Sequence, residues 1–368
     1  MDRPTARALL GRTPGLTAEA ATQLLAAAGG DVTAVAAQAR GAAGLSLAPA
    51  ARTYLASFDE RRLEADLEWL GANQAAIVLC TDSAYPPLLR QTAGAPAALY
   101  VQGSLALLAA PQLAMVGSRS PTPAGRATAR EFAAYFARVG LTVTSGLAVG
   151  IDAACHEGAL KAGGATLAVL GSGLDRLYPA EHGALAERMR AQGALVTEFP
   201  PGTAPLAANF PQRNRIIAGL ALGTLVVEAA SRSGSLITAR LAAEAGREVF
   251  AIPGSIHSPL SRGCHQLIRS GAKLVEQADD VLTELKFLVS KEPLTEARTA
   301  AASADQHGRE LDKEYEMLLD ALGFEPATID SLVARTELTS GAIASMLLIL
   351  ELEGRVATLP GGRYGRTP

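Results

Sequence analysis

Charged and aromatic residues are scarce in this 368-residue sequence, which argues against a protein that binds nucleic acid over its whole surface. Charged residues make up 19% and the net charge is −3, so any positive potential that attracts an anion has to be local. Aromatic residues make up only 4%, which limits the number of bases that could stack on rings. Nucleic-acid binding, if present, would therefore depend mainly on phosphate contacts.

Cysteine and long apolar runs are also scarce. The three cysteines, Cys80, Cys155 and Cys264, are odd in number and far apart, which predicts no disulfide framework and fits a reducing compartment. No run of about 18 apolar residues and no secretory leader is recognisable, so we expect a soluble, cytoplasmic protein without membrane contact. The neighbours Cys155-His156 and Cys264-His265 lack the spaced ligand pairs of a zinc site, and we expect neither a metal nor another cofactor.

Residues 1–72 are rich in alanine and leucine at helical spacing. Breaks at Pro14-Gly15 and Gly29-Gly30 divide them into short helices, which predicts a small all-helical domain similar to SAM or helix-hairpin-helix domains. The turn Thr13–Thr17 could offer backbone N–H groups to a DNA phosphate, or could simply connect two packed helices.

Residues 73–287 have a different pattern, in which short apolar strands alternate with helices. This alternation predicts an α/β domain with a Rossmann-like, mostly parallel sheet and helices on both faces. Residues 288–311 are polar and aperiodic, as in a linker, and residues 312–368 predict a winged helix of three helices and a strand pair. The strands expected in the central domain are 75–79, 113–116, 141–144, 166–170, 195–197, 224–227, 248–252 and 273–274.

Two glycine-containing turns follow predicted strands and could bind phosphate. They are Gly117-Ser118-Arg119 and Gly171-Ser172-Gly173, and each could equally be a tight turn without a ligand. A third turn leads to Asp152, which is either a helix-terminal charge or cap or a functional carboxylate. His156 follows one turn later, as a general base or as a structural partner of Asp152.

Arg213-Asn214-Arg215 stands just before a predicted apolar helix. Two guanidinium groups at the positive end of a helix dipole are unfavourable, so we expect a compensating anion, either a carboxylate of the fold or a bound phosphate. Ser233-Gly234-Ser235 opens a further helix, where its hydroxyl and N–H groups could converge on an anion or Ser235 could be an N-cap.

In this order, the motifs between residues 85 and 282 resemble those of the DNA processing protein A (DprA/Smf) family. The resemblance is carried by Val116–Arg119, Ser145–Ala148, Gly150–Asp152 with His156, Gly171–Asp175 with Tyr178-Pro179, Phe210–Ile217 and Ser233–Ala239. It implies a non-catalytic protein of natural transformation that binds and protects incoming single-stranded DNA and loads the RecA recombinase onto it. It also implies contact with single-strand-binding protein and a homodimer formed through the Rossmann-like domain.

The resemblance assigns DNA contacts to twelve residues. These are Gly117, Ser118, Arg119, Gly171, Ser172, Gly173, Arg213, Asn214, Arg215, Ser233, Gly234 and Ser235.

The sequence departs from the family pattern at three positions. Val149 and Ala180 stand where many relatives have a basic residue, and His265 stands where asparagine is usual. We expect Arg126, Arg176 or Arg232 to replace the missing charge.

Two other functions remain open. Gly219–Glu228 partly resembles the signature of phosphoribohydrolases, although the Pro-Gly-Gly is absent, so a nucleotide-binding hydrolase is the alternative. A duplex-binding regulator is disfavoured, because residues 312–368 carry five basic and nine acidic side chains and helix 340–350 contains no Lys or Arg. We therefore expect the winged helix to contact a second copy or a partner protein.

Overall fold

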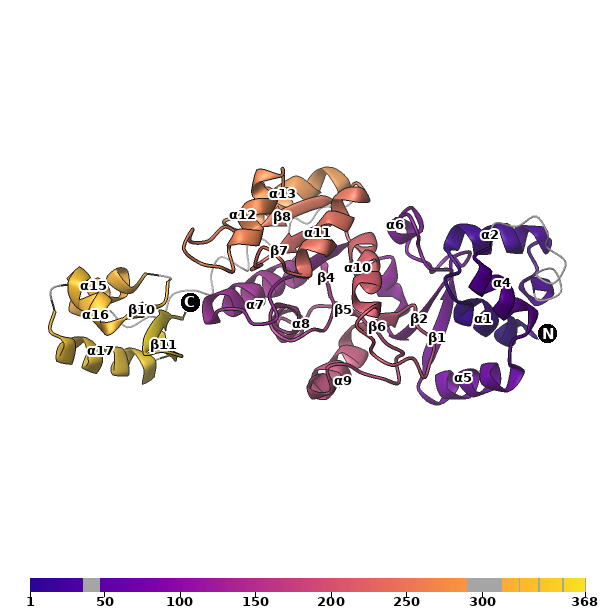
Figure 1. Cartoon of the computed structure of the whole chain (residues 1–368), viewed down its shortest axis with the longest axis horizontal. Coiled ribbons are helices and arrows are strands. Elements are labelled where there is room, and N and C mark those ends of the chain that lie inside the picture. Colours follow the sequence, from indigo (N-terminus) through magenta and orange to yellow (C-terminus); the bar gives the residue numbers. More distant parts are fainter. Residues whose placement is uncertain (36–46, 290–312, 324, 337, 353, 368) are drawn as a thin grey trace.

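The computed structural model describes residues 1–35, 47–289 and 313–367, apart from 324, 337 and 353. Figure 1 shows the arrangement of the elements. The helices are α1 (Arg3–Arg12), α2 (Ala18–Ala27), η1 (Val32–Ala34), α4 (Pro49–Ala56), α5 (Glu60–Ala72), α6 (Pro87–Arg90), η2 (Leu105–Leu108), α7 (Pro123–Arg138), α8 (Ile151–Lys161), η3 (Ala180–His182), α9 (Gly183–Gln192), α10 (Asn209–Leu220), α11 (Ser235–Glu244), α12 (Arg262–Arg269), α13 (Ala278–Val289), α15 (Lys313–Leu322), α16 (Ile329–Thr336) and α17 (Ser340–Leu352). The strands are β1 (Ala75–Leu79), β2 (Ala98–Gly103), β3 (Gln112–Val116), β4 (Thr142–Ser145), β5 (Thr166–Val169), β6 (Ala194–Thr197), β7 (Gly223–Val226), β8 (Glu248–Ala251), β9 (Lys273–Leu274), β10 (Ala327–Thr328), β11 (Val356–Leu359) and β12 (Arg363–Arg366).

Nine strands form the central sheet in the order β1-β2-β6-β5-β4-β3-β7-β8-β9. All neighbours from β6 to β9 are parallel, as the alternation of strands and helices predicted. The chain builds outward from β3 through β4 to β5, and later from β3's other side through β7 to β8. The order therefore reverses between β3 and β7, where open α/β sheets have a crevice at the carboxyl ends of their strands.

The buried sheet has an apolar core on each face. In β3, Leu113 and Met115 pack into the core formed with α7, α8 and α13, while Ala114 and Val116 belong to the core on the opposite face, which includes α10 and α11. Because successive strand residues point to opposite faces, a strand covered on both sides has to be apolar throughout. The predicted fold class is confirmed.

Two features of the sheet region differ from the sequence-based expectation. The strand expected at 75–79 is present as β1, but β2 and its antiparallel pairing with β1 and β6 were not predicted. Helix α10 begins at Asn209 rather than near Arg213, because Pro211 is tolerated in the first turn of a helix. Arg213 and Arg215 therefore lie inside the helix and not ahead of it.

The amino-terminal helices pack beside β1 and β2 (Figure 1). The turn Thr13–Thr17 docks on the sheet region, since Ala18 N donates to Ala95 O at 2.7 Å and Ala97 N donates to Leu16 O at 3.1 Å. These bonds support its reading as a connector between packed helices.

β1 is an edge strand of the sheet, and a side chain from α1 covers part of its free edge. Arg7 Nη2 donates to Ile77 O at 2.6 Å, and the Arg7 guanidinium also pairs with Asp82. Asp82 in turn accepts a hydrogen bond from Leu79 N at 2.8 Å. Backbone groups that would face solvent at this edge thus have partners inside the chain.

The carboxyl-terminal residues form the winged helix that was expected, with a sheet in the order β10-β12-β11 and its own apolar core. β10 adds a third strand to the predicted strand pair, and α16 begins directly after it at Ile329. The predicted linker, 288–311, lies outside the described residues except for its first two, which end α13. Among the described helices, none alone is long and apolar enough to cross a membrane, although α16 and α17 would pass that test as a bent pair.

Candidate nucleic-acid interface

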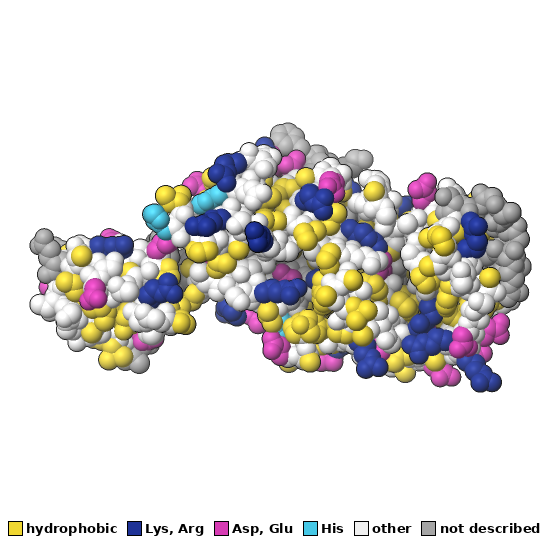
Figure 2. All heavy atoms as spheres, viewed as in Figure 1, with side chains coloured by type: hydrophobic (Ala, Val, Ile, Leu, Met, Phe, Trp, Pro, Cys, Tyr) yellow, Lys and Arg dark blue, Asp and Glu magenta, His cyan; other side chains and the backbone are white. Residues whose placement is uncertain are grey.

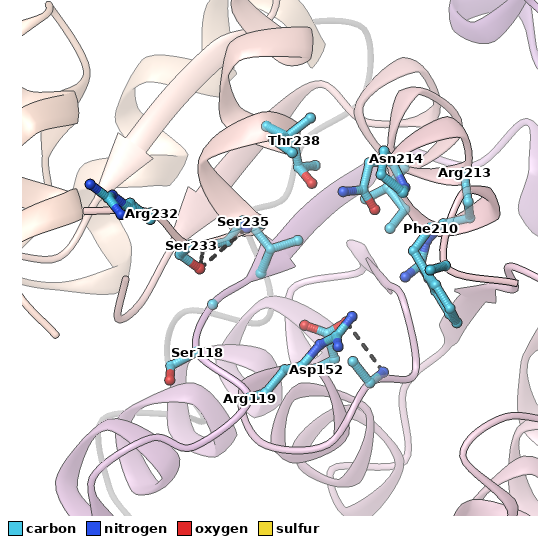
Figure 3. A pocket seen from close by; sticks show the side chains of 18 of the residues that line it. Ser118, Arg119, Asp152, Phe210, Arg213, Asn214, Arg232, Ser233, Ser235 and Thr238 are labelled. Carbon is cyan, nitrogen blue, oxygen red and sulfur yellow. Dashed lines mark hydrogen bonds between the residues drawn. The ribbon is translucent and has the colours of Figure 1, made fainter. Parts of the chain in front are cut away.

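A cavity of about 770 Å³ lies at the reversal point of the sheet, between the carboxyl ends of β3 and β7. Figure 3 shows its lining side chains, which come from the turns after these strands and from α10 and α11. Eight of the twelve predicted contact residues line it: Gly117, Ser118, Arg119, Arg213, Asn214, Ser233, Gly234 and Ser235. Their role in DNA binding stays a prediction.

The turn after β3 presents Arg119 to the cavity. Gly117 is needed for close packing, because a Cβ there would lie 2.7 Å from Ile151 Cγ1. Ser118 is buried, and its carbonyl accepts a hydrogen bond from Ile151 N at 3.1 Å, which fixes the turn against α8. The side chain of Arg119 is exposed and forms no ion pair with any described residue. It is a free cation on a rigid turn.

The turn after β7 presents hydroxyl groups and a second free cation. Ser233 Oγ lies 2.7 Å from Ser235 Oγ and accepts a hydrogen bond from Ser235 N at 3.3 Å. Ser235 is therefore not the side-chain cap of α11, and Gly234 beside it is exposed. Arg232 is exposed at the edge of the cavity and has no ion-pair partner in the described ranges. Figure 3 shows its side chain directed away from Phe210.

The opposite wall is apolar and partly aromatic. The rings of Tyr178 and Phe210 are 5.6 Å apart, and Tyr178 is 49% exposed. The Arg119 guanidinium carbon lies 5.8 Å from the centre of the Phe210 ring, within the range of a cation–π contact. Both aromatic residues belong to the motifs that resemble the family, but the sequence analysis predicted no contact role for them. The low aromatic content of the whole chain gave no sign that these two rings lie together beside the cavity.

Arg213 is a buried structural cation. It is 3% exposed, and Nη1 donates to Gly146 O at 2.7 Å and to Val169 O. Burial lowers the pKa of Arg213 to about 10, and the nearby Asp152 carboxylate opposes that change. Burial also raises the pKa of Asp152, which accepts a hydrogen bond from Gly146 N at 3.1 Å. Gly146 makes room for the guanidinium, since a Cβ there would lie 2.2 Å from Arg213 Nη1.

Arg215 lies outside the cavity, on the side of α10 that faces the amino-terminal turn. Its guanidinium pairs with Glu198, whose pKa is raised by burial and lowered by Arg215. The anions that compensate Arg213 and Arg215 are thus carboxylates of the fold, which was one of the two alternatives left open by the sequence.

The turn Gly171-Ser172-Gly173 is also outside the cavity. Gly173 N donates to Thr203 O at 3.0 Å, and Ser172 Oγ donates to Arg176 O at 2.7 Å. A Cβ at Gly171 would lie 2.9 Å from the Phe210 ring. The small residues here allow close packing beneath Phe210, and Gly173 N, Ser172 Oγ and the carbonyls of Gly171 and Ser172 have hydrogen-bond partners within the fold.

The acid–base candidates have structural partners. His156 is buried, its Nδ1 lies 2.7 Å from Thr166 Oγ1, and burial lowers its pKa to about 3. Its partner is therefore Thr166 and not Asp152. Glu228, the carboxylate of the partial hydrolase signature, accepts hydrogen bonds from Thr122 N at 2.9 Å and Thr122 Oγ1 at 2.6 Å.

Replacement of Thr122 by alanine tests this structural role of Glu228. Thr122 is the N-cap of α7, since its Oγ1 accepts from Gly125 N at 2.9 Å. Loss of the cap and of the hydrogen bond from Thr122 Oγ1 to Glu228 is expected to lower the free energy of unfolding by about 1–2 kcal/mol, while the backbone N–H of residue 122 still donates to Glu228. Urea denaturation would measure the loss, and a Thr122→Ser variant should retain most of the stability. No measurable loss in the alanine variant would contradict the cap.

Two family models match this sequence. One, described as DNA recombination-mediator protein A, covers residues 76–286, and the other, described as the DprA winged helix domain, covers residues 301–362. The chain belongs to the DNA recombination-mediator protein A family. The resemblance of its motifs to the DprA/Smf proteins is thereby confirmed.

Individual relatives agree with this membership. Protein Smf of Escherichia coli is 43% identical over 320 residues, which cover 87% of this chain and 84% of the relative. DNA processing protein DprA of Streptococcus pneumoniae is 48% identical over 206 residues, covering 56% and 73% of the two chains.

Two solved structures of the family are similar to this one. The X-ray structure of DprA from Streptococcus pneumoniae has a TM-score of 0.65 and 36% identity, covering 77% of this chain and 99% of the other. A structure of DprA from Helicobacter pylori, which concerns the single-stranded DNA binding mode of that protein, has a TM-score of 0.53 and 26% identity, covering 58% and 95% of the two chains.

Proposed function

We propose that this chain binds single-stranded DNA without sequence preference in the cavity between β3 and β7, and that it does so without catalysing a reaction. The observation that carries the proposal is the division of the cavity into two walls. One wall has the free cations Arg119 and Arg232 and the serine-rich turn, and the other has Tyr178 and Phe210.

The two walls match the two parts of an unpaired strand. Phosphates require cations and N–H or hydroxyl donors, while unstacked bases gain free energy on apolar and aromatic surfaces. Arg119 extends from the cationic wall toward the aromatic wall, because its guanidinium faces the Phe210 ring while remaining exposed. A duplex would hide its bases from the aromatic wall, so the arrangement favours single strands.

Other members of the family bear on the biological role. The Streptococcus relative is a DNA processing protein, and the Helicobacter protein binds single-stranded DNA. We propose that this chain likewise protects incoming DNA in the cytoplasm during natural transformation. We also propose that it loads RecA onto this DNA and contacts single-strand-binding protein. We also propose a homodimer formed through the Rossmann-like domain, for which the groove between α11 and α12 offers a partly apolar surface, with Leu236 and Leu267 beside Arg240 and Glu248.

The cavity lining supports a non-catalytic role. Among the described residues that line it, the single carboxylate is Asp152, which accepts hydrogen bonds from Gly146 N and Ala148 N and interacts electrostatically with Arg213. The contacts of Glu228 with Thr122 disfavour the phosphoribohydrolase alternative, because a catalytic glutamate has to face the substrate.

Binding of labelled oligo-dT and of a duplex of equal length, measured by fluorescence anisotropy at two salt concentrations, tests this function. We expect the single strand to bind at least about tenfold more tightly, with an affinity that falls as salt rises. Incubation with nucleoside monophosphates should release no free base. Equal affinity for single strand and duplex, or release of base, would overturn the proposal.

A further inference from the structure

The loop that precedes α12 adjoins the cavity but is not part of it. Ala229 N donates to Leu260 O at 2.7 Å, and Gly263 N donates to Ala229 O at 2.8 Å. A Cβ at Gly263 would lie 2.9 Å from Ala230 O, and Ala230 lines the cavity. The backbone of Arg262, next to Gly263, is therefore held directly beside the turn that carries Arg232.

This loop is held in place by its own hydrogen bonds. Ser258 N donates to Ser255 O at 3.0 Å, and Ser261 N donates to Ser258 O at 3.2 Å. His265, which departs from the family pattern, lies with Nε2 at 2.9 Å from Gly254 O. Lys or Arg and His side chains gather over α12 and the preceding loop in Figure 2. The surface beside the cavity is thus preformed and carries positive charge.

The charge on Arg262 has no compensation of the kind found for Arg213 and Arg215. Arg262 is exposed and, as far as the described residues extend, forms no ion pair. It is the first residue of α12, a helix with no side-chain cap and no acidic residue in its first turn. A cation at the positive end of a helix is unfavourable unless an anion is near, so this position suits a phosphate.

A separate cleft on the other side of α10, toward the amino-terminal domain, lacks this feature. The cleft there is lined by Arg12 and Arg215 among other residues. Arg12 makes a two-bond ion pair with Asp66, at 2.6 and 2.7 Å, and Arg215 pairs with Glu198. A strand that leaves the cavity on this side would meet charges that the fold has already neutralised.

We propose that single-stranded DNA extends from the cavity past Arg232 to Arg262, so that the loop 253–261 and the start of α12 form a second phosphate-binding segment. This inference rests on the proposed function of the cavity. The exposed Ile256, on the same loop, adds apolar surface for a base next to the charged segment. The side chain of Arg232, directed away from Phe210 in Figure 3, links the two segments.

The test compares a short and a long ligand. Oligo-dT of about 4 nucleotides is long enough for the cavity alone, whereas about 15 nucleotides would reach the second segment. We expect Arg262→Glu to weaken binding of the long oligonucleotide about tenfold, and to reduce the slope of log affinity against log salt by about 0.7–1, while leaving the short one within about twofold. Arg262→Lys should retain most of the affinity.

Arg188→Glu is the matched control, because Arg188 is exposed on α9 and makes no ion pair within the described ranges. Unchanged melting temperatures would show that both variants fold. Equal loss on both lengths, or no loss on either, would overturn the path past Arg262 while leaving the cavity's function intact. Failure of the unaltered protein to bind either oligonucleotide would instead reject the proposed function itself.

Discussion

Replacement of Arg119 by glutamate is expected to weaken binding of oligo-dT about a hundredfold. Loss of a charge-assisted hydrogen bond to phosphate costs about 1.5–3 kcal/mol, and the new carboxylate adds repulsion, while each 1.4 kcal/mol changes affinity tenfold. The slope of log affinity against log salt should fall by about one, because the strand releases fewer counterions. Arg119 is exposed and has no ion pair among the described side chains, so stability should hardly change.

The Arg119→Lys variant separates the contribution of the positive charge from that of the planar guanidinium. It keeps the positive charge but loses the planar guanidinium that faces Phe210. We expect about fivefold weaker binding with an unchanged salt slope. Anisotropy titrations at two salt concentrations measure both quantities. If Arg119→Glu changes neither the affinity nor the slope, the cavity is not where DNA binds.

Replacement of Arg213 by methionine is expected to lower the free energy of unfolding by about 3–5 kcal/mol, because Asp152 would remain buried without its counter-charge. The carbonyls of Gly146 and Val169 would lose their donor as well. Urea denaturation measures this loss. Adding Asp152→Asn to the same variant should recover about 1–2 kcal/mol, since the amide oxygen still accepts from Gly146 N and carries no charge.

The stability of the Arg213→Met variant should also depend on pH. Burial raises the pKa of Asp152, and Arg213 is the largest influence that lowers it, so removing Arg213 raises that pKa further. A carboxyl group whose pKa is higher in the folded than in the unfolded state binds protons more tightly when folded, so stability rises as pH falls toward the unfolded value. The deficit of the variant should therefore shrink between pH 7 and about pH 5, and the Asp152→Asn double variant should lack this recovery. A deficit independent of pH would argue against an unpaired Asp152.

The parallel part of the sheet could be predicted from the sequence because its strands are apolar on both faces. Residues 113–116 form such a run, and the expected strand nearly coincides with β3. β2 could not be recognised in the same way. Its place in the sheet depends on antiparallel pairing with β1 on one side and with β6, almost a hundred residues later, on the other.

Which arginines of the candidate site are exposed could not be predicted from the sequence. Arg119 and Arg213 look alike as members of polar motifs near helix starts, yet one is exposed and the other is 3% exposed. What separates them is the space left by Gly146 and the carboxylate of Asp152, neither of which adjoins Arg213 in sequence.

Glycine-rich turns are ambiguous for a related reason. Gly117 and Gly171 each follow a buried strand, and both are glycine because a Cβ would collide with a packed side chain. Only the first lies beside a cavity that could admit a ligand. The spacing of the glycines shows that a turn is tight. Whether that turn can bind a ligand depends on whether the rest of the fold leaves a cavity beside it.

The contact between Arg7 and Ile77 has a consequence for how the protein can be divided. A fragment consisting of the sheet alone would present the outer side of β1 with its peptide groups unpaired, and such a side templates pairing with other chains. We therefore expect the amino-terminal helices to protect this edge from pairing with other chains, a role that does not depend on a ligand. Removing them is therefore expected to lower the solubility of the protein.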